Sequence, residues 1–121
     1  MTSLVGHLIN GKIVTDADKT QDVFNPSSGE VSKQVALANR ATVNEAIAAA
    51  EKAFVSWRNT PAMKRARVMF KFKDLLEQHS TKICDLIGQE HGKIAHDAAG
   101  ELQRGIELSL IHISEPTRHE S

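Results

Sequence analysis

The stretch TVNEAIAAAEKAFVSWRNTP, residues 42–61, marks the change from one sequence pattern to another in this chain. Thr42 and Glu45 have the spacing of a capping box, in which the hydroxyl and the carboxylate each satisfy a free backbone N–H at a helix start. Apolar side chains then recur along one helical face, at Val43, Ile47, Ala50, Phe54 and Trp57. Thr60-Pro61 favours a second start, since proline is tolerated in the first turn of a helix. The stretch therefore predicts one helix from Thr42 and another from about Pro61.

Before this stretch the pattern is typical of short strands joined by turns. HLINGKIV at residues 7–14 places Asn-Gly between two β-rich runs, which is a strong hairpin signal because both residues tolerate positive φ. DVF at 22–24 and VSKQVALA at 31–38 are predicted to be further strands. TDADKT at 15–20 and NPSSGE at 25–30 have the composition of loops and turns.

After Pro61 the pattern is helical throughout. An apolar stripe runs towards residue 90 through Val68, Phe72, Leu75, Leu76, Ile83, Leu86 and Ile87. Gly92 is a predicted helix stop in left-handed geometry. A further helix is expected at about 94–107, where four-residue spacing relates Ile94, Ala98, Leu102 and Ile106. The chain is thus predicted to be mostly α-helical, with a short N-terminal region of β-hairpin and strands.

Composition excludes several classes of partner. The 121 residues carry 15 Lys and Arg against 15 Asp and Glu, so no net charge favours nucleic acid, a membrane surface or an acidic partner. No apolar run approaches the ~20 residues of a membrane span, and the first residues do not have the pattern of a signal peptide. We expect a single-domain cytoplasmic chain that binds neither nucleic acid nor membrane.

The residues that could carry chemistry are few. Cys84 is the only cysteine, which excludes an internal disulfide, and its apolar neighbours predict a core position inside a helix. His91 and His96 are five residues apart and do not share a helical face as metal ligands at i, i+4 would. The basic run that begins at Lys64 is interpreted as a solvated helix face, and no Gly-rich phosphate loop is present. The pattern alone therefore predicts no catalytic, cofactor-binding or metal-binding residue.

Several segments in a fixed order resemble the N-terminal quarter of the aldehyde dehydrogenase superfamily. They are INGK at 9–12, FNPSSGEV at 24–31, AAEKAFVSWRNTP at 49–61, RARVMFKFKDLLEQH at 65–79 and EHGK at 90–93. Within that superfamily, EHGKIAHDAAGELQRGIE at 90–107 is similar to the CoA-acylating methylmalonate (malonate) semialdehyde dehydrogenases, which carry an RGIE or RGLE element.

The resemblance implies an α/β fold for the complete enzyme, which would be a homo-oligomer, a tetramer. It implies oxidation of malonate or methylmalonate semialdehyde with NAD, transfer of the acyl group to CoA and loss of carbon dioxide. The catalytic cysteine and the NAD and CoA contacts of such enzymes lie downstream of the motifs found here, so Cys84 does not take the role of the nucleophile. By the same resemblance, Arg104 of the RGIE element would recognise the substrate carboxylate. The alternative is a solvated arginine on an exposed helix.

Residues 108–121 depart from the family pattern. LSLIHISEPTR at 108–118 resembles the translation of a transposase-based sequencing-library adaptor. We therefore expect residues 1–107 to be an incomplete N-terminal part of an aldehyde dehydrogenase domain, and residues 108–121 to be a non-native tail in which no helix continues. Two functional hypotheses follow: an inactive piece of an oxidoreductase, or a free-standing helical interaction module that binds a partner through the stripes at 43–57 and 68–87.

Overall fold

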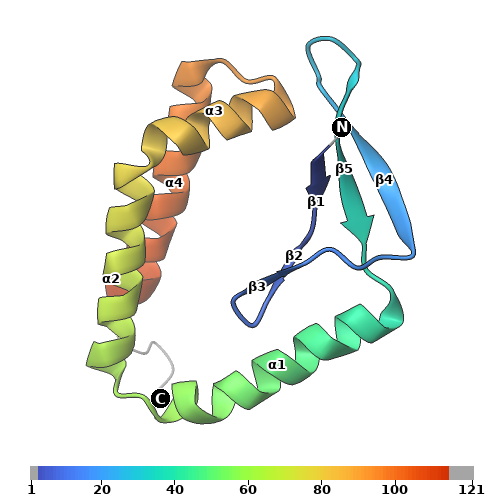
Figure 1. Ribbon diagram of the computed structural model, residues 1–121. Coiled ribbons are helices and arrows are strands. Elements are labelled where there is room, and N and C mark those ends of the chain that lie inside the picture. Colours follow the sequence, from blue (N-terminus) through green and yellow to red (C-terminus); the bar gives the residue numbers. More distant parts are fainter. Residues whose placement is uncertain (1–2, 115–121) are drawn as a thin grey trace, which may run out of the picture. The chain divides into compact units, whose positions relative to one another are not determined.

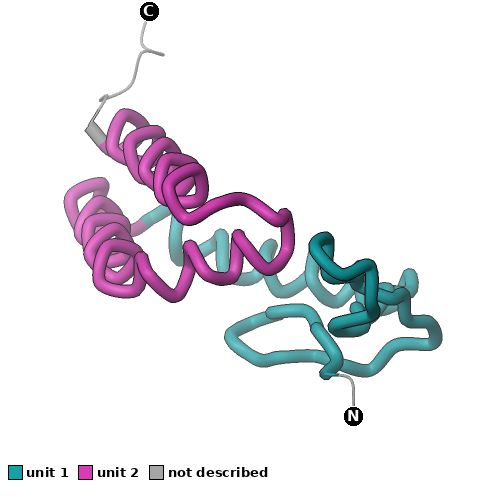
Figure 2. The backbone as a smooth tube through the Cα atoms, turned by 90° about the horizontal axis from the view of Figure 1, so that it is seen from above, with its two compact units in different colours: residues 1–59 teal, residues 60–121 magenta. Residues whose placement is uncertain are grey.

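The computed structural model describes residues 3–114, and it divides into two compact units at residues 59 and 60 (Figure 2). The first unit contains β1 (Ser3–Val5), β2 (His7–Ile9), β3 (Lys12–Val14), β4 (Lys19–Phe24), β5 (Val31–Leu37) and α1 (Arg40–Asn59) (Figure 1). The second unit contains α2 (Ala62–Gln78), α3 (Ser80–His91) and α4 (Ala95–Ser114). The predicted fold class, mostly helical with a β-rich start, is confirmed.

The predicted hairpin is formed by β2 and β3, which pair antiparallel with Ile9 opposite Lys12. Asn10 and Gly11 connect them with φ values of 51° and 74°. Both turn residues thus have the positive φ that a type I′ turn needs, and this turn matches the twist of the flanking strands. The Asn-Gly signal therefore predicted this element correctly.

A three-stranded sheet has β5 in its centre, parallel to β1 on one side and antiparallel to β4 on the other. Across the β4–β5 pair, the Gln34 side-chain amide donates to Asp22 Oδ1 at 3.0 Å. β4 begins at Lys19, so the prediction of a loop through residue 20 is wrong at its end. Lys19 pairs with Leu37 in the ladder, and this contact with a strand eighteen residues later extends β4 beyond its local pattern.

The turn predicted at residues 25–30 is closed by Asn25. Its side-chain oxygen accepts the Ser27 N–H at 2.9 Å, and its backbone oxygen accepts the Gly29 N–H at 2.8 Å. An asparagine side chain that bonds two residues ahead mimics a backbone turn, which explains why this residue type stands here. The turn prediction is confirmed.

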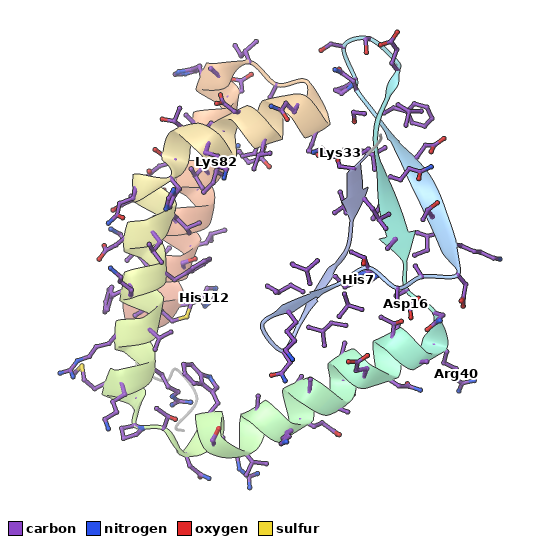
Figure 3. The ribbon with its side chains drawn as sticks, in the orientation of Figure 1. His7, Asp16, Lys33, Arg40, Lys82 and His112 are labelled. Atoms are coloured by element: carbon purple, nitrogen blue, oxygen red, sulfur yellow. The ribbon has the colours of Figure 1, made fainter. Side chains whose placement is uncertain are left out.

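The start of α1 differs from the capping-box prediction at Thr42. The helix begins at Arg40 (Figure 3). Asn39 Oδ1 accepts both the backbone N–H of Thr42 at 2.9 Å and the Thr42 hydroxyl at 3.0 Å, while Val43 N–H donates to the Asn39 carbonyl at 3.1 Å. Asn39 is therefore the capping residue, and Thr42 lies inside the first turn. Asparagine is at least as good a helix cap as threonine, which is why the earlier position wins.

The stripe predicted to run without interruption from residue 61 towards 90 is divided at His79. This residue has φ −102° and ψ 15°, and it ends α2 and precedes α3. Its N–H donates to the Leu75 carbonyl, and its own carbonyl accepts the Ile83 N–H, both at 3.0 Å. The break thus leaves these backbone groups hydrogen-bonded. Both α2 and α3 contact α4, and the bend allows each of them to do so. A stripe in one sequence segment carries no information about that third helix.

The end of α3 is as predicted, since Gly92 has φ 81° in the left-handed region and its N–H donates to the Gly88 carbonyl at 2.8 Å. The predicted end of the last helix at residue 107 is wrong. α4 continues to Ser114, so that His112 lies on its last turn (Figure 3). Residues 106–114 contain no glycine or proline, and nothing in the backbone interrupts the helix. Residues 115–121 lie outside the described residues, and the non-native origin of 108–121 stays a prediction.

Very little of the chain is buried. Among residues 3–114, the buried apolar side chains are Ile9, Ala36, Ala98 and Ile106. In the first unit, the apolar stripe of α1 is exposed, with Phe54 57% accessible to solvent. In the second, Phe70 and Phe72 of α2 are exposed as well. No helix in this part of the chain is long and apolar enough to cross a membrane.

We expect Asn39→Ala to lower the free energy of unfolding by about 1 kcal/mol, since loss of a side-chain cap typically costs that much. Thr42→Ala should cost clearly less, because the Thr42 backbone N–H keeps its acceptor. The measurement is urea unfolding followed by far-UV circular dichroism. Asp18→Ala serves as the control, since Asn39 also donates to Asp18 Oδ2. If Thr42→Ala lowers the free energy of unfolding more than Asn39→Ala does, Thr42 and not Asn39 is the capping residue.

The exposed apolar faces predict self-association of the purified chain. Contiguous apolar surface without a partner favours association, and a chain with few buried side chains has little stability of its own. Sedimentation velocity over a range of concentrations should show a weight-average mass that rises above 13.3 kDa. A monodisperse monomer with one sharp thermal transition would contradict this expectation.

Candidate functional site

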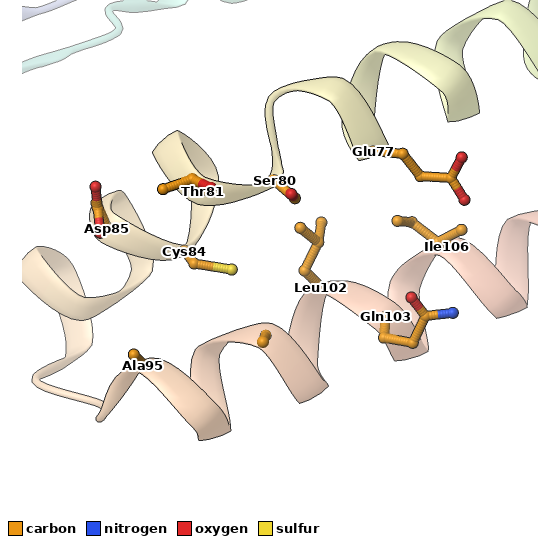
Figure 4. A pocket seen from close by; sticks show the side chains of 10 residues that line it. Glu77, Ser80, Thr81, Cys84, Asp85, Ala95, Leu102, Gln103 and Ile106 are labelled. Atoms are coloured by element: carbon orange, nitrogen blue, oxygen red, sulfur yellow. The ribbon is translucent and has the colours of Figure 1, made fainter.

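The second unit has a groove of about 450 Å³ between α3 and α4 (Figure 4). Four-residue spacing on α4 places Leu102 and Ile106 along its wall, and α3 contributes Thr81 and Cys84. The groove is thus mostly apolar, with short polar side chains on the α3 side. Its lining follows directly from the spacing of small and branched residues on the two helices.

Cys84 is a free, half-buried thiol in this groove, with its side chain directed towards α4 (Figure 4). A reactive cysteine needs a nearby cation or a helix N-terminus to stabilise the thiolate. Within the described part of the chain, the groove is lined by no lysine, arginine or histidine, and Cys84 is at the fifth position of α3. The surroundings of Cys84 therefore do not favour nucleophilic chemistry.

A second, polar hollow of about 260 Å³ lies where α3 ends and α4 begins. Its lining contains two basic side chains, an imidazole, one carboxylate and a glycine, contributed by Lys93, Arg104, His96, Asp97 and Gly100. The excess of cationic side chains suits a small anion rather than a metal ion. Among residues 3–114, no three histidine, cysteine, aspartate or glutamate side chains form a group that could hold a metal.

Arg104, the predicted substrate residue, lies on the third turn of α4 and is exposed. His96, Gly100 and Arg104 follow each other at four-residue intervals, and side chains at this spacing share one helical face. A Cβ atom at Gly100 would lie 4.0 Å from Arg104 Nη1. Within the described residues, the Arg104 guanidinium makes no hydrogen bond or ion pair. It is therefore free to bind an external acceptor.

An ion pair beside this hollow was not predicted from the sequence. Lys93 Nζ donates to Glu101 Oε2 and so connects the α3–α4 turn to the second turn of α4. The hydrogen bond and the charge of Lys93 hold the pKa of Glu101 below its usual value, and the charges of His91 and Arg104 add to this effect. The two partners are eight residues apart across Gly92. The i, i+3 and i, i+4 rules apply only within one helix, so the sequence alone could not predict this pair.

The structure also shows where the two histidines and the basic run of α2 lie. His91 and His96 lie on either side of the α3–α4 turn, and only His96 lines the hollow. The basic run on α2 contains an exposed ion pair, in which Lys73 Nζ lies 2.8 Å from Glu77 Oε1. This hydrogen bond raises the pKa of Lys73. A pair at i, i+4 on a helix surface is typical of a solvated face.

Comparison with known proteins gives relatives that agree in their names. The chain is 56% identical over 101 residues to malonate-semialdehyde dehydrogenase from Pseudomonas aeruginosa, a match that covers 84% of this chain and 20% of that protein. It is 39% identical over 117 residues to malonate-semialdehyde dehydrogenase 1 from Geobacillus kaustophilus, which covers 96% of this chain and 24% of the relative. The chain thus spans about a fifth to a quarter of the length of these curated relatives.

Solved structures agree as well. The crystal structure of methylmalonate-semialdehyde dehydrogenase from Oceanimonas doudoroffii has a TM-score of 0.90 and 61% identity, over 94% of this chain and 23% of that one. A provisionally named methylmalonate-semialdehyde dehydrogenase from Sinorhizobium meliloti, complexed with NAD, has a TM-score of 0.90 and 36% identity over the same shares. The aldehyde dehydrogenase family matches residues 13–120, which is most of the chain. The chain belongs to the aldehyde dehydrogenase family.

Proposed function

We propose that the chain is the N-terminal part of an NAD-dependent, CoA-acylating methylmalonate or malonate semialdehyde dehydrogenase. The observation that carries the proposal is Arg104. It belongs to the RGIE element, it lines a polar hollow, and its guanidinium is free to bind an external carboxylate. The names of relatives at 56% and 61% identity support the same substrate class.

The role of Arg104 follows from the difference between the proposed substrate and a plain aldehyde. A semialdehyde acid carries a distal carboxylate, and a site that removes this charge from water must provide a cationic partner. A guanidinium offers two parallel N–H donors to the two carboxylate oxygens, which fixes the orientation of the acid as well as its affinity. Because Gly100 has no side chain, there is room for a carboxylate beside the Arg104 guanidinium.

The complete reaction would convert methylmalonate semialdehyde, CoA and NAD into propionyl-CoA, carbon dioxide and NADH; malonate semialdehyde would give acetyl-CoA. The sequence has no Gly-rich phosphate loop, so we place the NAD site elsewhere in the complete enzyme. The structure of the Sinorhizobium meliloti relative with NAD supports NAD for the complete enzyme. We assign the nucleophile and the NAD and CoA sites to the remainder of the enzyme, and the carboxylate subsite to this chain.

The complete enzyme would be a cytoplasmic homo-oligomer, a tetramer, that acts on a small semialdehyde. Residues 1–107 would be its N-terminal part and residues 108–121 a non-native tail. The rival hypothesis of an interaction module rests on the stripes at 43–57 and 68–87, which lie on α1, α2 and α3, and an incomplete enzyme would expose them too.

The isolated chain is predicted to have no NAD-dependent aldehyde oxidation, because it provides neither an activated nucleophile nor a site for the hydride acceptor. The measurement is NADH formation from methylmalonate semialdehyde and from propanal, with and without CoA. Cofactor reduction by the purified chain that disappears in Cys84→Ser would overturn the prediction.

The role of Arg104 can be tested in a chimera that joins residues 1–107 of this chain to the remainder of the Pseudomonas aeruginosa relative. Charge-assisted hydrogen bonds contribute about 1.5–3 kcal/mol. Arg104→Leu should therefore lower kcat/KM for methylmalonate semialdehyde by about tenfold to a hundredfold, since each 1.36 kcal/mol is tenfold.

Propanal, which lacks the carboxylate, is the matched control substrate and should be turned over by Arg104→Leu as before. General damage to the fold would lower the activity on both substrates together, and Arg104 would then be structural. Unchanged activity on both would show a solvated helix residue and would refute the proposed site.

A further inference from the structure

Two carboxylates lie three residues from Arg104 on α4, Glu101 before it and Glu107 after it, and Glu107 accepts a hydrogen bond from the Gln103 side-chain amide at 3.3 Å. Residues three apart on a helix are surface neighbours, and an acid and a base at this spacing attract each other. After the hydrogen bond and charge of Lys93, the charge of Arg104 also helps to lower the pKa of Glu101. Glu101, on the side of Arg104 that faces the α3–α4 turn in sequence, is thus an internal competitor for the guanidinium that the proposed function assigns to the substrate.

Glu101 is nevertheless bonded elsewhere. Its Oε2 atom accepts a hydrogen bond from Lys93 Nζ, and the Lys93 side chain is the less exposed partner, at 26% against 47% for Glu101. Gly92 sets the direction of the turn from which Lys93 reaches α4, through its left-handed backbone. The hollow is lined by Lys93 and Arg104 but not by Glu101. The ion pair therefore holds the competing carboxylate outside the hollow.

We propose that Lys93 is a positioning residue: by binding the Glu101 carboxylate it keeps Glu101 from pairing with Arg104, and so leaves the Arg104 guanidinium available to the substrate carboxylate. This inference rests on the proposed function of Arg104 and adds the device that keeps it available. It also identifies Glu101 as the group whose release would inhibit the site. Asp97 is a carboxylate that lines the hollow itself, two turns before Arg104, and it provides a matched comparison.

The test uses the same chimera and compares substitutions of equal net charge. Lys93→Met alone should raise KM for methylmalonate semialdehyde about two- to fivefold with kcat unchanged, a modest effect because exposed pairs are weak. Turnover of propanal should not change. Lys93→Met with Glu101→Gln should return KM to the parent value. Lys93→Met with Asp97→Asn, which has the same net charge, should stay impaired.

The outcomes separate the possible roles of Lys93. Restoration by both double variants would show a general field effect of the lost cation and would overturn the proposal. Restoration by neither would show that Lys93 binds the substrate itself or only supports the fold, and would overturn it too. If Arg104→Leu is selective for the acid substrate but Lys93→Met has no effect, this inference fails alone. If Arg104→Leu is not selective, the proposed function fails with it.

A second readout needs no activity and uses the chain itself. Carboxyl-carbon NMR should show Glu101 titrating below the usual range of a glutamate, and Lys93→Met should raise its pKa. The sign follows from the lowered pKa: the ion pair is complete above the ordinary glutamate pKa and is lost as the pH falls through the lowered value. A Glu101 pKa that does not change in Lys93→Met would show that the pair does not form, and would overturn the proposal.

Discussion

Local closure of backbone hydrogen bonds is the constraint on which both units depend. Among residues 3–114, four apolar side chains are buried, so burial alone does not hold these segments in place. The hydrogen bonds of Asn25 and Asn39 and the left-handed Gly92 instead satisfy the backbone where strands and helices end. Groups left unpaired at such ends would cost free energy comparable to a lost hydrogen bond. At these three places the end of an element is therefore defined by residues close to it in the sequence.

The closure of backbone hydrogen bonds at the end of α3 also helps to form the hollow beside Arg104. The left-handed Gly92 ends α3 and allows α4 to begin three residues later, which brings Lys93 next to the second turn of α4. Ala98 and Ile106, which are eight residues apart and buried, hold α4 against its neighbours on another face. Arg104 is thus carried by a helix whose position is determined by packing, while its own side chain stays exposed.

Family membership gives the exposed apolar surface a physical meaning. The chain corresponds to about a fifth to a quarter of its relatives' length, and its matched structures agree closely in backbone. The apolar stripe of α1 and the phenylalanines of α2 are the kind of surface that a larger α/β enzyme buries. In the proposed complete enzyme, further segments would cover this exposed surface.

The sequence by itself determined those elements whose signals are local. Asn10-Gly11 predicted the hairpin, Asn25 to Glu30 the turn, and Gly92 the end of α3, because each depends on backbone φ or on a bond to a residue nearby. The family motifs also identified the superfamily. Arg104 could be singled out as a candidate site residue only through that resemblance, since an arginine on a polar helix face has no distinguishing pattern.

Tertiary structure decided what depends on a partner distant in sequence. Lys19 joins β4 because Leu37 pairs with it, and the helix after Pro61 divides at His79 where two segments contact α4. The Lys93–Glu101 pair forms across a turn that no helical spacing describes. In each case a contact between distant segments stabilises the observed conformation. The spacing of apolar residues in the sequence does not show which segments will contact each other.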